Sequence, residues 1–92
     1  MAVDLEYISV KYSATEACDA LSLIQISTHK SDYIYDVLRL RNLIRTNGFP
    51  QFSDEKIVKV FHGSDSDLKY LEADLGVTTI NVFDTARALS FI

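Results

Sequence analysis

The fold is decided by residues 58–77, VKVFHGSDSDLKYLEADLGV. This stretch opens inside an apolar run, Ile57 to Phe61, whose β-branched residues predict a buried strand. After a break at Gly63, leucines recur at helical spacing until Gly76, which occupies the place of a helix C-cap glycine. A strand, a sharp turn and a helix are therefore predicted, and ligands bind at such strand ends in open α/β sheets.

Acidic residues follow the predicted strand. Ser64 and Asp65 are expected to cap the helix, because acids in a first turn suit the helix dipole. Asp67 and Tyr70 are three residues apart, so they lie on one side of the helix. An acid and an aromatic side chain are thus predicted to face the same space.

The composition bounds the class of protein. The chain has 92 residues, of which 48% are apolar, as expected for one small globular domain. No apolar run approaches the roughly 20 residues of a membrane helix, and Met1 leads directly into a predicted strand, which leaves no room for a signal peptide. The lone Cys18 favours a reducing intracellular compartment. A net charge of −4 argues against a basic patch for nucleic acid, so divalent metal would have to offset the acids at any phosphate site.

The first strand is predicted over Ala2 to Tyr7. Asp4 and Glu6 alternate with apolar residues and therefore share one face of the strand. Two neighbouring acids repel each other unless they are solvated or share a cation. An edge strand with a wet acidic face is the simpler alternative for this segment.

The rest of the chain predicts a mixed sheet with helices. Residues 8–19 have no clean period and are expected to form a loop, with a helical turn possible at residues 14–20. Further strands are expected at residues 20–28, 32–37 and 77–82, and further helices at residues 38–47 and 86–92. In the second strand, Leu21, Leu23 and Gln25 are expected to alternate against Ser22, Ile24 and Ile26.

The connections predict how these strands pair. Tight turns join the first three strands, which should be antiparallel, and helical crossovers should add parallel strands. With the first strand at the centre of the sheet, Asp4 and Glu6 would lie near the end of the strand at residues 57–61, close to Asp67.

Five segments carry a resemblance to a known family. In chain order they are VDLE, SLIQIST, DYIYDVL, VKVFHGSDSDLKYLEADLGV and NVFDT. They closely resemble the DEDD 3′–5′ exonucleases of the RNase D group, with the nuclear, exosome-associated branch the nearest match. The resemblance covers nearly the whole chain, and H-G-x-x-x-D followed by F-D-T is far more specific than D-x-E. It implies a truncated α/β ribonuclease H-like fold, with residues 1–92 as a partial exonuclease domain.

The resemblance also implies roles for individual residues. Asp4 and Glu6 match the first exonuclease motif and Asp67 matches the second, so these three acids would be catalytic and would bind two Mg²⁺ or Mn²⁺ ions. Tyr70 matches an aromatic position near the 3′-terminal nucleotide. Tyr7 stands where relatives often carry His, and with Tyr70 it would bind substrate. Asp84, in the F-D-T signature, is read as a structural helix N-cap.

Two departures from the family pattern qualify the implied activity. No Tyr-x-x-x-Asp follows Asp84, so the third motif is absent and the two-metal site is incomplete in this chain. The second departure is the loop after Glu6, which is longer than the usual family pattern and differs from it in sequence, with Tyr7 at the position after the glutamate. Separately, the last predicted helix ends on apolar Phe91 and Ile92, which would offer a dimer surface.

The family implies a metal-dependent 3′–5′ exoribonuclease that releases nucleoside monophosphates in RNA processing or decay. Its substrate would be a single-stranded RNA 3′ end, its partner an exosome-type complex and its compartment the nucleus. Two alternatives stay open. One is a non-catalytic fragment that binds RNA or protein, and the other is a DNA-directed exonuclease of the same superfamily.

Overall fold

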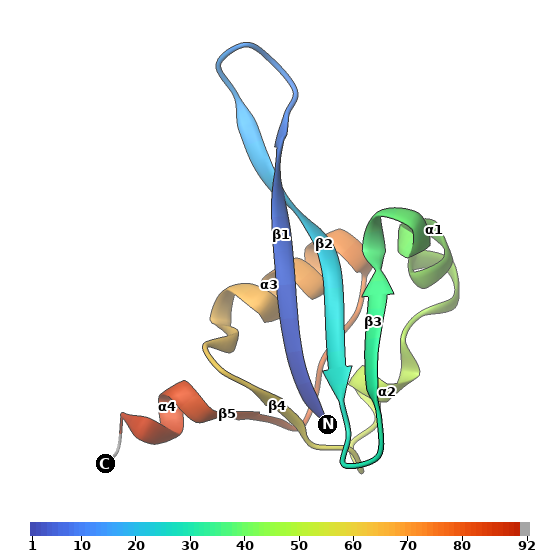
Figure 1. Ribbon diagram of the computed structural model, residues 1–92, viewed down its shortest axis with the longest axis vertical. Coiled ribbons are helices and arrows are strands. Elements are labelled where there is room, and N and C mark those ends of the chain that lie inside the picture. The colour runs from blue at the N-terminus through green and yellow to red at the C-terminus, as the bar shows by residue number, and fades with distance from the viewer. Residues whose placement is uncertain (91–92) are drawn as a thin grey trace.

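The structure is a computed structural model that describes residues 1–90. One five-stranded sheet has the strand order β3-β2-β1-β4-β5. The first three strands are antiparallel, and β4 and β5 run parallel to β1 (Figure 1). The predicted mixed sheet with the first strand at its centre is confirmed. The elements are β1 (Ala2–Lys11), β2 (Ala17–Ser27), β3 (Asp32–Asp36), α1 (Val37–Asn47), α2 (Pro50–Ser53), β4 (Lys59–Phe61), α3 (Ser64–Leu75), β5 (Val82–Asp84) and α4 (Thr85–Leu89).

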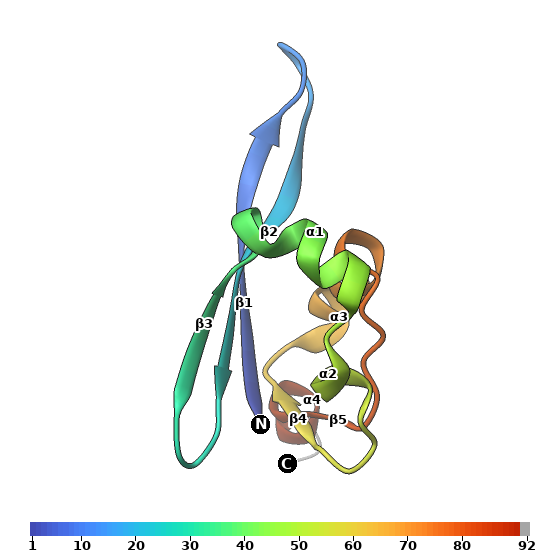
Figure 2. The same cartoon turned by 90° about the vertical axis from the view of Figure 1, so that its right-hand side faces the viewer.

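The helices α1, α2 and α3 lie on one side of the β1-β2-β3 part of the sheet (Figure 2). The hydrophobic core fills the space between these two layers. Its buried members are Val3, Leu5, Leu21, Ile24, Ile26, Val37, Ile44, Phe52, Phe61, Leu71, Leu75 and Val77. Among residues 1–90, no element covers the opposite face of these three strands (Figure 2). The acidic positions of β1 therefore stay accessible.

The segment after the first acids differs from the prediction. Residues 8–19 form neither a loop nor a helical turn, because β1 continues to Lys11 and β2 begins at Ala17. The two strands make a long hairpin that projects beyond the rest of the molecule (Figure 1). At its tip, the Ser13 hydroxyl accepts hydrogen bonds from the amides of Thr15 and Glu16 at 3.3 and 3.0 Å. Apolar and polar residues do alternate along Ile8 to Tyr12, and this period of two is the strand signal that the prediction missed.

A β-bulge changes the alternation of β2. Glu6 pairs with Leu23 and Tyr7 pairs with Leu21, so Ser22 is an extra residue between the two pairs. The predicted grouping of Leu21 with Leu23 and Gln25 is therefore wrong. Instead, Leu21 is buried with Ile24 and Ile26 on the core face. The Ser22 hydroxyl donates to the Glu6 carbonyl at 3.1 Å.

Two side chains satisfy the backbone next to this bulge. The amide of Leu21 donates to Asp74 Oδ2 at 3.2 Å, and its carbonyl accepts from Arg41 Nη2 at 3.0 Å. Arg41 of α1 and Asp74 of α3 also form an ion pair, and both are mostly buried. The ion pair thus joins two helices to the point at which the sheet departs from regular pairing.

The later strands differ from the prediction. The strand expected at residues 57–61 is shorter and spans Lys59–Phe61. The strand expected at residues 77–82 is wrongly placed, because β5 begins only at Val82 and ends at Asp84. The buried Lys59 ammonium donates to the carbonyls of Asp54 and Ile80 at 2.6 and 3.0 Å, which ties the start of β4 to the flanking loops.

The last predicted helix is seen as Thr85–Leu89. Phe91 and Ile92, with the dimer surface predicted there, lie outside the described residues. Across residues 1–90, none of the helices is long and apolar enough to cross a membrane.

Candidate active site

Tyr7 lies between the two predicted functional residues of α3. Its hydroxyl donates to Asp67 Oδ1 at 2.6 Å, and its ring centroid is 4.7 Å from that of Tyr70. Asp67 and Tyr70 stand one helical turn apart, and Leu71 anchors the same face of α3 in the core. The acid and the aromatic residue of α3 do face the same space, and Tyr7 of β1 fills part of it.

Asp67 occupies an unfavourable place for a carboxylate. Burial raises its pKa above the usual range, the hydrogen bond from Tyr7 opposes this rise, and the negative charges of Asp4 and Asp84 add to it. Burial and the neighbouring Asp67 also raise the pKa of the Tyr7 hydroxyl, which keeps its proton and can donate. A cation beside Asp67 would stabilise its ionised form.

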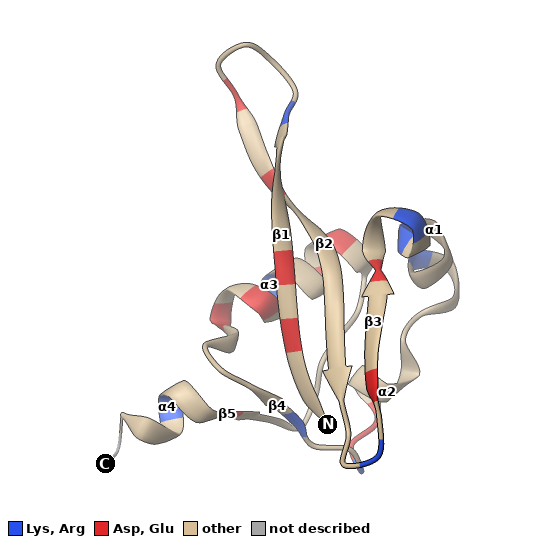
Figure 3. Cartoon of the chain, viewed as in Figure 1, with Lys and Arg blue, Asp and Glu red and all other residues tan. Residues whose placement is uncertain are grey.

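Asp4 and Glu6 are exposed, whereas Val3 before them and Leu5 between them are buried. The two acids therefore share the face of β1 that turns away from the core. Asp4 lies close enough to raise the pKa of Asp67, so these two carboxylates are within electrostatic reach of each other. Figure 3 shows acidic residues on both β1 and α3, the elements that contribute to this site.

The full grouping of Asp4, Glu6 and Asp67 around shared cations stays a prediction. Within residues 1–90, no group of three or more His, Cys, Asp or Glu side chains is arranged to hold a metal ion. The donor chemistry nevertheless fits the predicted ions, because carboxylate oxygens are the ligands that Mg²⁺ and Mn²⁺ prefer.

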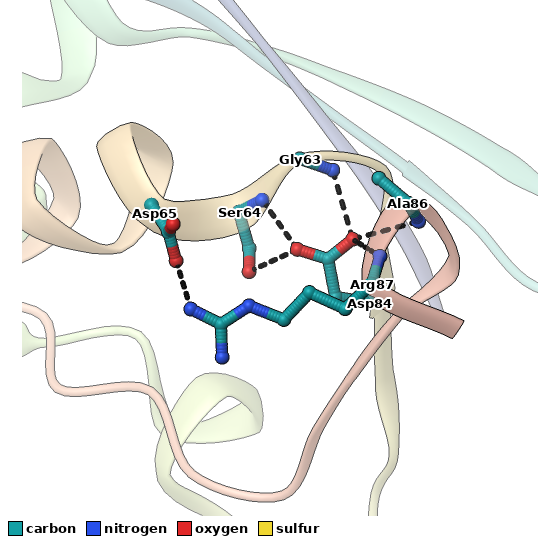
Figure 4. Close-up of polar contacts among 6 residues, drawn as sticks. All are labelled: Gly63, Ser64, Asp65, Asp84, Ala86 and Arg87. Carbon is teal, nitrogen blue, oxygen red and sulfur yellow. Dashed lines mark hydrogen bonds and ion pairs between the residues drawn. The ribbon is translucent and has the colours of Figure 1, made fainter. Parts of the chain in front are cut away.

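Asp84 is the helix N-cap that the sequence predicts. Its Oδ1 accepts from the amides of Ala86 and Arg87, at 2.9 and 3.4 Å, at the start of α4. The same carboxylate also accepts from the Gly63 amide at 2.9 Å, and from the amide and the hydroxyl of Ser64, both at 2.7 Å (Figure 4). This second set of contacts was not predicted from the sequence.

The contacts of Asp84 correct the expected capping of α3. Neither Ser64 nor Asp65 caps this helix, because the N-cap residue is Gly63, which has no side chain to contribute. Asp65 is exposed and forms an ion pair with Arg87 (Figure 4). The register of the sheet explains how Asp84 takes over this role, since it pairs with Phe61 at the end of the parallel strand β4.

The hydrogen bonds to Asp84 also fix its charge. The Ser64 hydroxyl, and then the amides of Gly63 and Ser64, hold the pKa of Asp84 well below its usual range. The carboxylate therefore stays ionised at neutral pH, between the positive ends of two helix backbones.

Comparisons with known proteins identify the family of this chain. A family described as 3′–5′ exonuclease matches residues 1–92. Exosome complex component 10 of Homo sapiens is 42% identical over 87 residues, which make up 95% of this chain and 9% of the human protein. The exosome complex exonuclease RRP6 of Saccharomyces cerevisiae is 42% identical over 89 residues, 96% of this chain and 11% of the yeast protein.

Solved structures give the same result. The catalytic core of RRP6 from Trypanosoma brucei matches with a TM-score of 0.81 and 38% identity, over 97% of this chain and 23% of that one. RNase D from Trypanosoma brucei, solved in complex with RNA U12, matches with a TM-score of 0.74 and 26% identity, over 91% and 29% of the two chains. This chain thus spans less than a third of each of these proteins. The resemblance predicted from the sequence is confirmed, and the chain belongs to the 3′–5′ exonuclease family.

Proposed function

We propose that this chain supplies part of the active site of a metal-dependent 3′–5′ exoribonuclease that acts in RNA processing or decay. The observation that carries the proposal is the state of Asp67. Its carboxylate is half-buried, is held by Tyr7 and lies within reach of the charge of Asp4. Ordinary surface acids are solvated and do not meet these conditions, whereas ligands of a cation do.

Asp4, Glu6 and Asp67 are the residues that would hold Mg²⁺ or Mn²⁺. When bound, such ions supply an activated water and charge stabilisation at the leaving oxygen of a phosphodiester. The Tyr7 hydroxyl would keep the Asp67 carboxylate oriented toward the acids of β1. The released products would be nucleoside monophosphates.

The proposed substrate is the 3′ end of a single-stranded RNA. RNase D of Trypanosoma brucei, which has been solved with RNA, supports this choice by similarity. Tyr70 is partly exposed and packs against Tyr7, so its ring is available to stack on the terminal base. Tyr7 would contribute to the same contact by supporting the ring of Tyr70.

The relatives also suggest a partner and a compartment. The human and the yeast relative are both named for the exosome complex, and this chain covers 9% and 11% of their lengths. We extend this by proposing an exosome-type complex in the nucleus as the setting for this protein.

One observation favours a second candidate function. Within residues 1–90, the acids are not arranged in a group of three that could hold a metal. A non-catalytic module that binds RNA or protein through the same surface would have this property.

An RNA degradation assay separates the two functions. The purified chain is incubated with Mn²⁺ and a 5′-labelled single-stranded RNA, and with a DNA of the same sequence. Stepwise shortening of the RNA from its 3′ end, absent in Asp4→Asn, is the expected result for the enzyme. Binding of RNA without shortening would support the module, and faster shortening of the DNA would support the DNA-directed exonuclease.

Metal binding is tested separately by calorimetric titration with Mn²⁺. Asp67→Asn should abolish most of the binding heat, since it removes a charged ligand. Asp65→Asn is the matched control, because Asp65 lies in the same helical turn but is exposed and paired with Arg87. Equal heats from the parent chain and Asp67→Asn would contradict the assignment of Asp67 as a ligand.

A further inference from the structure

Asp84 makes more contacts than the N-cap of α4 requires. Capping α4 uses the hydrogen bonds from Ala86 and Arg87. Three further donors, the amide of Gly63 and both donors of Ser64, converge on the same carboxylate from the start of α3. One side chain at the end of β5 thus serves the first turns of two helices (Figure 4).

The helix α3 depends on this carboxylate because it has no capping side chain of its own. Gly63 stands at its N-cap with φ of 78°, a left-handed conformation that favours glycine. Ser64 is buried, so its amide could not turn to water if Asp84 were lost. The position of the first turn of α3 relative to the sheet is therefore set by Asp84.

The first turn of α3 also carries Asp67. Only one helical turn separates Ser64 from Asp67, and the backbone between them is regular α-helix. At the end of this turn, the Asp67 carboxylate accepts a hydrogen bond of 2.6 Å from the Tyr7 hydroxyl of β1. A shift of the helix at Ser64 would therefore move Asp67 by a similar amount and would break its hydrogen bond with Tyr7.

We propose that Asp84 is a positioning residue for Asp67: through Ser64 and Gly63 it fixes where α3 holds the Asp67 carboxylate against the Tyr7 hydroxyl of β1. In this role Asp84 acts through the helix. Its charge also reaches Asp67, but Ser64→Ala leaves that charge in place and changes only the contact to the helix. This inference rests on the proposed function, which assigns Asp67 as a metal ligand.

The test compares Mn²⁺ affinity in three variants of the chain by calorimetry, at a temperature well below the melting transition of each. Asp84→Asn keeps the size of the side chain but replaces one acceptor oxygen with a donor, so it cannot accept from all five groups. Ser64→Ala removes only the hydroxyl bond. Asp65→Asn is the matched control, because this acid lies in the same turn but is exposed and pairs with Arg87.

We expect Asp84→Asn to weaken Mn²⁺ binding about ten-fold, as outer-shell substitutions at metal sites commonly do, and Ser64→Ala about three-fold. Asp65→Asn should bind as the parent chain does. An NMR measurement supplies a readout without metal: the nuclear Overhauser effect between the Tyr7 ring and the Asp67 β-protons should weaken in the same order.

The outcomes are distinguishable. Parent-like affinity and a parent-like Tyr7–Asp67 contact in folded Asp84→Asn would overturn the positioning role and leave the proposed function intact. If Asp84→Asn does not fold, Ser64→Ala decides, and parent-like values in that variant overturn the inference. If neither the parent chain nor any variant, Asp67→Asn included, releases or absorbs heat on titration with Mn²⁺, the proposed function fails. The positioning role then fails with it.

Discussion

The carboxylates of Asp84 and Asp67 both lie at the first turn of α3, but their environments shift their pKa values in opposite directions. Asp84 accepts five hydrogen bonds from Gly63, Ser64 and the start of α4, and its pKa is lowered. Asp67 accepts one hydrogen bond, from Tyr7, within the described part of the chain, and its pKa is raised, chiefly by burial. Both are poorly exposed acids of one small region, so burial alone does not distinguish them.

The difference lies in what surrounds each carboxylate. Asp84 has donors at both oxygens and needs no other partner, which is the state of a structural acid. Within residues 1–90, Asp67 has acceptor sites that no donor fills, and a second acid, Asp4, is near enough to raise its pKa, so a cation would stabilise it. The number of donors around each carboxylate therefore distinguishes the structural acid Asp84 from Asp67, for which we propose a ligand role.

The largest effect is expected from Asp84→Ala. This substitution leaves the amides of Gly63 and Ser64 and those at the start of α4 without their acceptor. We expect the melting temperature, followed by circular dichroism, to fall by about 10 °C or more. The control, Asp65→Ala, removes only an exposed ion pair and should change the melting temperature by less than about 2 °C. Similar shifts in the two variants would contradict the structural role of Asp84.

An intermediate effect is expected when the pH is lowered. Because the pKa of Asp84 is depressed on folding, its contribution to stability is complete above the ordinary value of 3.8 and is lost as the pH falls below it. The free energy of unfolding, measured with urea at a series of pH values, should therefore decline below pH of about 4. The decline should be shallower in Asp84→Asn, and parallel curves for the two chains would show that this carboxylate is not the group responsible.

The smallest effect, of opposite sign, is expected from Asp67→Asn without metal at pH 7. The change removes a charge that burial and Asp4 disfavour, while the amide oxygen can still accept from the Tyr7 hydroxyl. The melting temperature should stay the same or rise by about 2–4 °C. A fall as large as that of Asp84→Ala would mean that Asp67 is held for stability and not for a ligand.

Much of the fold follows from the sequence because its signals are local. The leucine spacing and Gly76 predict α3, and Gly76 does end that helix in a left-handed conformation with φ of 67°. The central place of β1 follows from the order of strands and helices. The five segments that resemble the exonuclease family predict the family, which the comparisons confirm.

The features that sequence reasoning missed depend on distant contacts. Nothing near Ser64 indicates that its cap comes from Asp84, twenty positions away along the chain. Likewise, nothing near Arg41 indicates that it pairs with Asp74 beside the backbone of Leu21. Such choices are made by tertiary packing, so propensity and periodicity do not record them.

The extra residue at Ser22 divides β2 into two stretches with independent phase. The stretch nearest the helices keeps Ile24 and Ile26 in the core, and the stretch beyond Leu21 follows the projecting hairpin. Because the paired residues between Ile8 and Ala20 contribute nothing to the buried core, one residue can be added to or removed from each strand at the hairpin tip without rotating any core side chain. The hairpin is thus an extension whose length can change while the acids at its base keep their places.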